Sequence, residues 1–317
     1  MKCLYCGKPL SEHEVGNDVT GGWHAKCVKS FFGTLELPKF DLSTEGLIKL
    51  AESSVGSGNT VPGVQKKISW FATSKKKRRL TVTGVPSAYI LKPETDDYPH
   101  LPEAEHLCMS MAKATGIRTV PFALIRAEVG YVYITKRVDR ADGKMFAMED
   151  FCQLDGRMSE DKYKGSYERC AKIIQRYSCR EGFDLSELFL RLVFSFVSGN
   201  SDMHLKNFSL IEEEEGSQRY ALSPAYDLLP VNLILPDDEE QTALALNGKK
   251  SNLRLHDFLS FAKAIGLSDS ASVKLIRDVV GMRNKYVAMI FESLLPDEMK
   301  DDFANLIDGR INILNLG

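Results

Sequence analysis

The most informative stretch of the sequence is a polar loop that follows a strongly apolar helical pattern over residues 185–198. The loop reads Gly199-Asn200-Ser201-Asp202-Met203-His204-Leu205-Lys206-Asn207-Phe208-Ser209. Asp202 and Asn207 are five residues apart, the same spacing as the aspartate and asparagine of a kinase catalytic loop. In phosphoryl transfer such an aspartate orients or deprotonates the attacking hydroxyl, and such an asparagine holds a metal ion on the phosphates. The loop therefore favours phosphoryl-transfer chemistry.

A second acidic position follows in Ser223-Pro224-Ala225-Tyr226-Asp227. Two short strands are predicted over 207–211 and 219–222, around the acidic turn 212–215. Such a hairpin brings Asp227 back beside Asn207, where it can supply a second metal-binding carboxylate. The alternative is that these residues cap turns and a helix, which explains either motif alone but explains the pair poorly.

Outside this region the hydrophobic pattern changes along the chain. Before about residue 140 it predicts strands with one helix between them, over 64–73, 80–83, 88–92, 102–115 (the helix), 122–125 and 130–137. Later residues predict helices, over 185–198 with Asp184-Leu185-Ser186-Glu187 as N-terminal cap, 254–265, 269–294 and 296–313. We therefore expect an α+β fold with a small strand-rich lobe (residues 34–140) and a helical lobe (residues 141–317).

Lys92 ends one of the predicted strands and is followed by a proline. A lysine there can reach the α- and β-phosphates of a nucleotide, and a glutamate on the next helix can hold it in place. Glu105, one turn into that helix, is the better candidate, and Glu103 is the second choice. Taken alone, a surface lysine at a strand end is the more common reading.

Two close pairs of soft metal ligands lie at the N-terminus, Cys3-x2-Cys6 and His24-x2-Cys27, separated by 17 residues. This pattern is typical of tetrahedral Zn²⁺ in small structural knuckles. Residues 1–33 are thus predicted to be a zinc-knuckle-like unit in which the metal has a structural role. The alternatives are reduced cysteines with His24 packed beside Trp23, or His13 as a replacement ligand.

The overall composition excludes several classes of protein. The 317 residues carry 41 Lys+Arg against 43 Asp+Glu, a formal net charge of −2, and 44% of them are hydrophobic. This balance argues against a disordered tail and against a basic nucleic-acid coat, and the basic run 75–79 is read as a solvated turn. The most apolar run, 188–197, is too short for a membrane span, and a secretory signal is not apparent. Seven cysteines indicate free thiols, so we expect a cytoplasmic protein with no membrane or direct nucleic-acid partner.

Several stretches resemble, in the same order, the HipA-like serine/threonine kinases, which are the toxin halves of bacterial toxin–antitoxin systems. They are Thr60-Val61-Pro62-Gly63-Val64-Gln65-Lys66-Lys67, Tyr89-Ile90-Leu91-Lys92-Pro93, Glu105-His106, Lys136-Arg137-Val138-Asp139-Arg140, the Asp202 loop and Tyr226-Asp227. The resemblance covers residues 45–310. It is closest to the short HipT-type kinases, because little chain precedes the phosphate loop.

The resemblance implies a kinase-like fold and an activity that uses ATP and Mg²⁺. Asp202 would be the catalytic residue, and Asn207 and Asp227 would hold Mg²⁺. The nucleotide would be bound by Pro62, Gly63, Val64, Gln65, Lys66, Lys67, Lys92, the hinge residues Lys136, Arg137 and Val138, and by His204 and Tyr226. Thr60 occupies the position that becomes autophosphorylated in the family, which adds negative charge where the ATP phosphates bind. Pro62 replaces the second hydroxyl residue of HipT-type loops, so two-site regulation is not expected.

The resemblance also implies partners. The protein substrate would be an aminoacyl-tRNA synthetase, and the antitoxin would contain a HipB-like helix-turn-helix DNA-binding subunit, with a separate HipS-like subunit as a further option. Rival readings are an aminoglycoside-type small-molecule phosphotransferase, a non-catalytic kinase-like binding module and a DNA-associated repressor subunit. The loop from Thr60 to Lys67 fits the toxin kinases better than a small-molecule phosphotransferase. A non-catalytic module has no reason to keep the whole set of expected site residues, which are Lys92, Asp202, Asn207 and Asp227.

Overall fold

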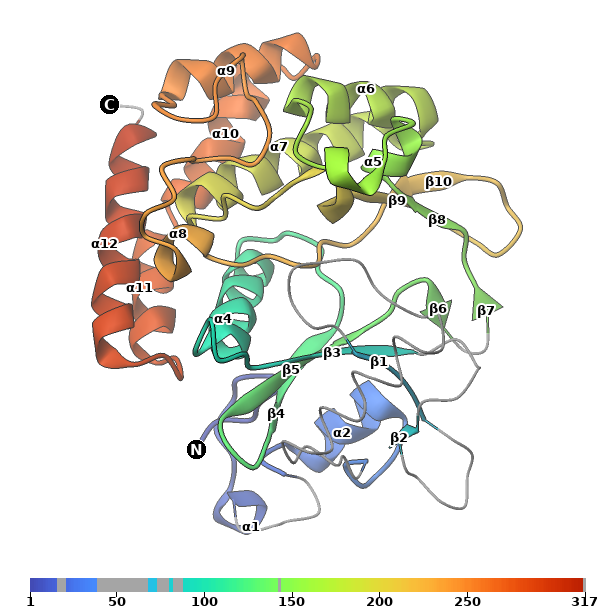
Figure 1. Cartoon of the computed structure of the whole chain (residues 1–317), viewed down its shortest axis with the longest axis vertical. Coiled ribbons are helices and arrows are strands. Elements are labelled where there is room, and N and C mark those ends of the chain that lie inside the picture. Colours follow the sequence, from blue (N-terminus) through green and yellow to red (C-terminus); the bar gives the residue numbers. More distant parts are fainter. Residues whose placement is uncertain (16–20, 39–67, 73–79, 82–87, 142–143, 316–317) are drawn as a thin grey trace. The chain divides into compact units, whose positions relative to one another are not determined.

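The computed structural model describes residues 1–15, 21–38, 68–72, 80–81, 88–141 and 144–315. The chain divides into two compact units (Figure 1). The first consists of Met1–His106 and Val120–Gly143, and the second of Leu107–Thr119 and Lys144–Gly317. Strands dominate the first unit and helices the second, so the predicted α+β class is confirmed. None of the helices in the described ranges has the length and apolar character needed to cross a bilayer.

The first unit is built on a five-stranded antiparallel sheet with strand order β2-β1-β3-β5-β4. Its strands are β1 (Ile68–Ala72), β2 (Leu80–Thr81), β3 (Tyr89–Pro93), β4 (Phe122–Arg126) and β5 (Tyr131–Lys136). Leu91, Val132 and Ile134 are fully buried, as expected for side chains at the centre of a covered sheet. Lys92 pairs with Tyr133 across the two central strands. Helix α4 (Leu101–Ala114) follows β3, as predicted.

The Cys/His segment packs within the first unit. It contains α1 (Glu12–Val15) and α2 (Ala25–Phe32). The indole nitrogen of Trp23 donates to the Leu124 carbonyl at 3.1 Å, and the Tyr89 hydroxyl donates to the Phe31 carbonyl at 3.1 Å. The rings of Trp23 and Phe31 also meet edge to face. The segment therefore shares its core with the sheet, and one of its contacts is to the strand that carries Lys92.

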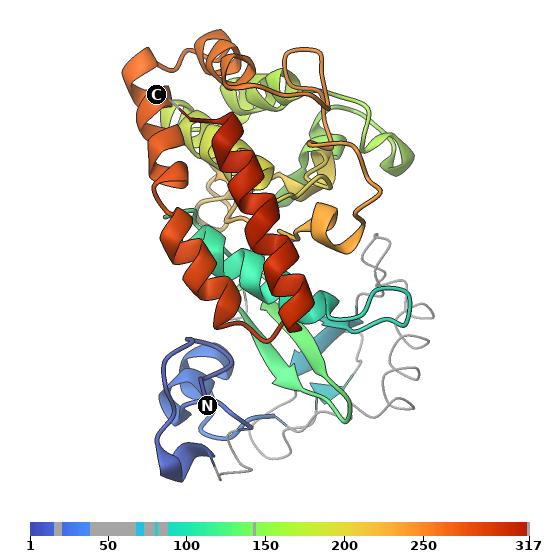
Figure 2. The same cartoon turned by 90° about the vertical axis from the view of Figure 1, so that its left-hand side faces the viewer.

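Helix α7 (Glu181–Val197) is the centre of the second unit and is buried along most of its length. It contacts α6 (Tyr167–Tyr177), α10 (Asp269–Val280) and α12 (Asp297–Ile313). The predicted cap at Asp184 is wrong, because the helix begins at Glu181 and Asp184 lies inside it. The predicted helix over 269–294 is two helices, α10 and α11 (Arg283–Phe291), and Figure 2 shows α11 beside α12.

A turn at Gly199 connects the end of α7 to the polar loop. Gly199 has φ 68°, a left-handed conformation that glycine adopts without strain. The Asn200 N–H donates to the Ser195 carbonyl at 2.8 Å, and the Gly199 N–H donates to the Phe196 carbonyl at 3.3 Å. These two bonds form a Schellman motif, which satisfies carbonyls left open at the helix end. A Cβ atom at Gly199 would lie 2.6 Å from Cδ2 of Leu306, so a larger residue here would require the Leu306 side chain to shift.

A three-stranded antiparallel sheet in the order β10-β9-β8 follows the loop. The predicted strand over 207–211 starts later, at Ser209, because Leu205–Asn207 forms a 3-10 turn. The remaining elements of the second unit are β7 (Lys144–Met145), β8 (Met148–Asp150), α5 (Phe151–Leu154), η1 (Ser159–Asp161), η2 (Leu205–Asn207), β9 (Ser209–Glu212), β10 (Tyr220–Leu222), α8 (Val231–Ile234) and α9 (Leu255–Ala264), and β6 (Arg140–Ala141) belongs to the first.

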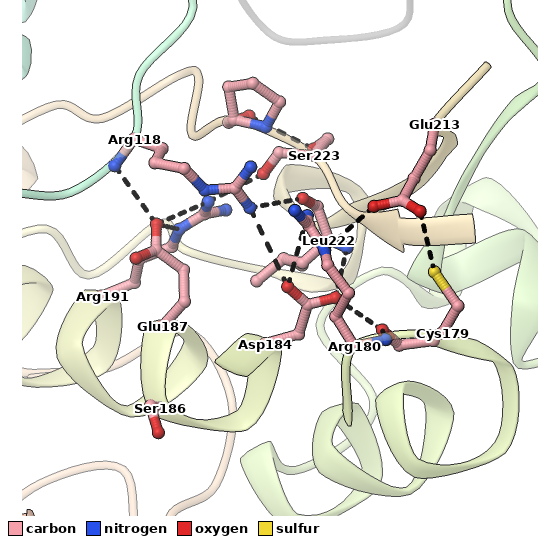
Figure 3. A network of polar contacts seen from close by, with 12 residues as sticks. Arg118, Cys179, Arg180, Asp184, Ser186, Glu187, Arg191, Glu213, Leu222 and Ser223 are labelled. Atoms are coloured by element: carbon pink, nitrogen blue, oxygen red, sulfur yellow. Dashed lines mark hydrogen bonds and ion pairs between the residues drawn. The ribbon is translucent and has the colours of Figure 1, made fainter. Parts of the chain in front are cut away.

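A buried network of charged side chains holds the segment that leads to Asp227 (Figure 3). Arg191, fully buried on α7, donates from Nε and Nη2 to Glu187 and from Nη2 to the Ser223 carbonyl at 2.7 Å. The Leu222 N–H donates to Asp184 at 2.7 Å. The Arg118 guanidinium donates to the Leu222 carbonyl at 2.8 Å. Side chains from helix α7 and from the segment after α4 therefore hydrogen-bond to the same short stretch of backbone, Leu222 and Ser223.

We predict that Arg191→Met lowers the free energy of unfolding by about 3–5 kcal/mol, because it leaves the Glu187 carboxylate buried without its cation. Chemical denaturation followed by circular dichroism measures this loss. Arg191→Met combined with Glu187→Leu should cost less than Arg191→Met alone, since no unpaired charge remains. Arg283→Met, which removes an exposed pair with Asp308, is the matched control and should scarcely move the midpoint. A similarly small effect of Arg191→Met would contradict the network's structural role.

Candidate phosphoryl-transfer site

The loop from Asp202 to Asn207 is closed on itself by hydrogen bonds. The Asn207 side-chain Nδ2 donates to the Asp202 carbonyl oxygen at 2.8 Å. Backbone N–H groups of His204 and Asn207 donate to the carbonyls of Asp202 and His204 at 2.8 and 2.9 Å. The Asp202 side chain stays 42% exposed, whereas Asn207 is buried. Because the amide nitrogen of Asn207 is engaged, its amide oxygen is the atom left to bind a cation.

His204 is buried beside Asp202. Its Nε2 is 4.0 Å from Oδ2 of Asp202. Burial lowers the pKa of His204, while the charges of Asp202 and Asp227 act in the opposite direction, so both carboxylates are near the ring. A lowered pKa keeps the imidazole neutral at pH 7. Its Nδ1 is buried and has no hydrogen-bond partner among the described residues, so it is a polar atom that a bound nucleotide can satisfy.

Tyr226 connects the loop to Asp227. Its hydroxyl donates to the Lys206 carbonyl at 3.1 Å and lies 2.5 Å from Oγ of Ser209, on the two sides of Asn207. Burial raises the pKa of Tyr226, so the phenol keeps the proton that it donates. Asp227 follows with φ 60°, a left-handed conformation uncommon outside glycine. Carboxylate and amide oxygens are the ligands that Mg²⁺ takes in proteins, so Asp227 and Asn207 fit that ion.

Lys92 forms a buried ion pair. Its Nζ is 2.5 Å from Oε1 of Glu105, and both side chains are almost fully buried. Glu103 instead faces His100 at 3.5 Å, and burial raises the pKa of its carboxyl group. A buried lysine held by a glutamate is the arrangement that protein kinases use to orient nucleotide phosphates.

The predicted hinge lies at the end of β5. The N–H groups of Lys136 and Arg137 are used internally, donating to the carbonyls of Pro121 and Ala88 at 2.9 and 2.8 Å. The Arg137 guanidinium is paired with Asp139 at 2.7 Å. Among the described residues, the Val138 N–H has no backbone hydrogen-bond acceptor. The predicted phosphate loop, comprising Thr60 and Pro62, Gly63, Val64, Gln65, Lys66 and Lys67, lies outside the described residues.

The four predicted zinc ligands meet in one cluster. The ligand atoms of Cys3, Cys6, His24 and Cys27 all lie within 4.8 Å of one another. Nδ1 of His24 is 3.3 Å from Sγ of Cys6 and 3.7 Å from Sγ of Cys27. Tetrahedral Zn²⁺ with such ligands requires separations of about 3.5–3.8 Å. Nε2 of His24 lies 3.0 Å from the Pro9 carbonyl, the kind of second contact that orients a ligating imidazole. The set therefore fits zinc.

Sequence reasoning missed Tyr163, whose hydroxyl donates to Oδ1 of Asp202 at 2.5 Å. No local motif connects these residues, because 39 positions separate them. It also missed the network around Arg191, in which a charged residue within an apolar helix was the one available signal.

Comparisons with known proteins show which proteins the chain is similar to. The model of the HipA-like C-terminal domain family matches residues 59–286. A protein of Haemophilus influenzae named "Putative kinase" is 28% identical over 99% of this chain and 97% of its own length. "Putative kinase Y4mE" of Sinorhizobium fredii is 30% identical over 75% of this chain, which spans only 59% of that relative.

Among solved structures, HipA of Shewanella oneidensis, in a complex with HipB and operator DNA, superposes with a TM-score of 0.69 at 18% identity. The match covers 80% of this chain and 64% of that one. This likeness confirms the predicted kinase-like, HipA-like fold. Since the family model matches well over half of the sequence, the chain belongs to the HipA-like C-terminal domain family.

Proposed function

We propose that this chain is an ATP- and Mg²⁺-dependent protein kinase that phosphorylates serine or threonine hydroxyls. The observation that carries the proposal is the closed Asp202–Asn207 loop, with the charge of Asp227 acting on the same histidine as Asp202. The Asp202 side chain is 42% exposed and is therefore available to a substrate, whereas the proposed metal ligand Asn207 is buried. The names of the relatives support kinase chemistry in general, and the Ser/Thr specificity rests on the family resemblance.

The proposed reaction needs few covalent roles from the protein. A substrate hydroxyl oxygen bonds to the γ-phosphorus of ATP as the bond to the β,γ-bridging oxygen breaks, and ADP leaves. Asp202 orients the hydroxyl and accepts its proton. Asn207 and Asp227 would hold Mg²⁺, which neutralises the phosphate charges, and the Lys92–Glu105 pair would steady the nucleotide. Val138 N–H would contact adenine, and the loop Pro62–Lys67 would cover the phosphates.

The proposed partners follow from the family. The Shewanella oneidensis relative is seen with HipB and operator DNA, which supports a HipB-like helix-turn-helix antitoxin for this chain. An aminoacyl-tRNA synthetase as substrate and a separate HipS-like subunit rest on the resemblance alone. We also propose one structural Zn²⁺ per chain on Cys3, Cys6, His24 and Cys27, because four ligands leave no open position for catalysis.

After incubation with Mg·ATP, the wild-type protein should gain one phosphate on Thr60, whereas Asp202→Asn should gain none. Intact-mass spectrometry followed by peptide mapping measures this, and circular dichroism checks that the variant is folded. Wild-type protein that already carries the phosphate is to be treated with phosphatase first. Equal incorporation by Asp202→Asn would remove Asp202 from the catalytic role.

Cys3→Ser combined with Cys6→Ser should abolish zinc binding and lower thermal stability, because the metal links segments that pack on the sheet. Elemental analysis of purified protein gives the expected stoichiometry of one zinc per wild-type chain. Cys179→Ser, which changes an exposed cysteine outside the cluster, is the matched control and should keep the zinc. Unchanged metal content and stability in the double variant would refute the zinc site.

A further inference from the structure

The segment Ser159–Tyr167 lies along the Asp202 loop and contacts it at four places. The Leu205 N–H donates to the Lys162 carbonyl at 3.2 Å. Lys206 Nζ donates to Oγ of Ser159 at 2.9 Å, and the buried Tyr167 hydroxyl donates to the Met203 carbonyl at 3.3 Å. The fourth contact is the Tyr163 hydroxyl on Asp202. This segment therefore belongs to the site as built, although it lies far from the loop in sequence.

Tyr163 is fixed in place by more than its hydroxyl. Its ring meets the His204 ring edge to face, with centroids 5.1 Å apart, and the Lys162 ammonium lies 4.8 Å from the Tyr163 ring centroid. Burial and the neighbouring Asp202 charge raise the pKa of Tyr163, so the phenol remains protonated and can act only as a donor toward the carboxylate.

The hydrogen bond from Tyr163 uses one carboxylate oxygen of Asp202, and the other oxygen does not take part in it. Tyr163 donates to Oδ1 at 2.5 Å. Oδ2 faces Nε2 of His204 at 4.0 Å, which is beyond hydrogen-bond distance. A half-exposed carboxylate on a loop rotates freely unless a donor holds it, and general-base catalysis depends on its orientation. Tyr163 thus holds the carboxylate while Oδ2 remains for the attacking hydroxyl.

We propose that Tyr163 is a positioning residue that orients the Asp202 carboxylate for phosphoryl transfer. The inference rests on the proposed function, since it gives Tyr163 a role only through Asp202. In this view, the segment Ser159–Tyr167 also forms part of the active site. The competing idea is a gate, in which the phenol occupies the place of the substrate hydroxyl and must leave before reaction.

Tyr163→Phe removes only the hydroxyl and keeps the ring that packs against His204. The rate of ADP formation from Mg·ATP should fall about tenfold or more at saturating nucleotide, because a loosened general base is misplaced in most enzyme molecules. The ATP concentration giving half of that rate should stay within about twofold of the wild-type value, since Tyr163 contacts the base and not the nucleotide. Tyr177→Phe, at a similarly exposed tyrosine on α6, is the matched control.

The loss of rate caused by Tyr163→Phe should also disappear when the Asp202 carboxylate has been replaced. In an Asp202→Asn background, adding Tyr163→Phe should change the residual rate by less than about twofold. A Tyr163→Phe rate equal to that of wild type would overturn the positioning role, and a faster rate would favour the gate instead. Either result leaves the proposed function standing. No ADP formation by folded wild-type protein that has been treated with phosphatase would reject the proposed function, and the inference with it.

Discussion

The hydrogen bond from the Asn207 amide to the Asp202 carbonyl is the interaction on which the site depends. It joins the two ends of a short polar loop, so the residue proposed to handle the substrate hydroxyl and the residue proposed to bind metal have a fixed separation. The loop starts directly after α7, which ends at Val197 and is capped by the turn at Gly199. A largely buried helix, packed against α6, α10 and α12, therefore carries the polar loop at its C-terminal end.

Hydrogen bonds within the second unit also fix the segment that leads to Asp227. The Tyr226 hydroxyl contacts the Lys206 carbonyl and the Ser209 hydroxyl, on the two sides of Asn207. Arg191 and Asp184 on α7 hold the backbone that precedes Tyr226. A residue in a left-handed conformation persists only where its surroundings determine it. Burying an arginine and its carboxylate partner contributes little net stability, but losing one of them is costly. The network thus gives positional precision rather than a large gain in folding free energy.

Much of the architecture could be predicted because its signals are local. The strand that ends in Lys92, the helix that carries Glu105 and the helix before Gly199 all follow from periodicity within a few residues. The cap predicted at Asp184 is wrong because the helix begins at Glu181, and the Asp184 carboxylate inside it accepts the Leu222 N–H instead. Tyr163 and the docking of Trp23 on Leu124 could not be predicted, since both contacts join residues far apart in the chain.

Asn207 and Asp227 are proposed to hold a metal ion that is needed to bind ATP. Calorimetric titration of ATP, with and without Mg²⁺, tests this proposal directly on wild-type protein and on the folded variant that combines Asn207→Ala with Asp227→Asn. We predict that Mg²⁺ strengthens ATP binding to wild type and has no such effect on the variant. ATP affinity that does not depend on Mg²⁺ in wild type, or an equal Mg²⁺ effect in both proteins, would contradict the account.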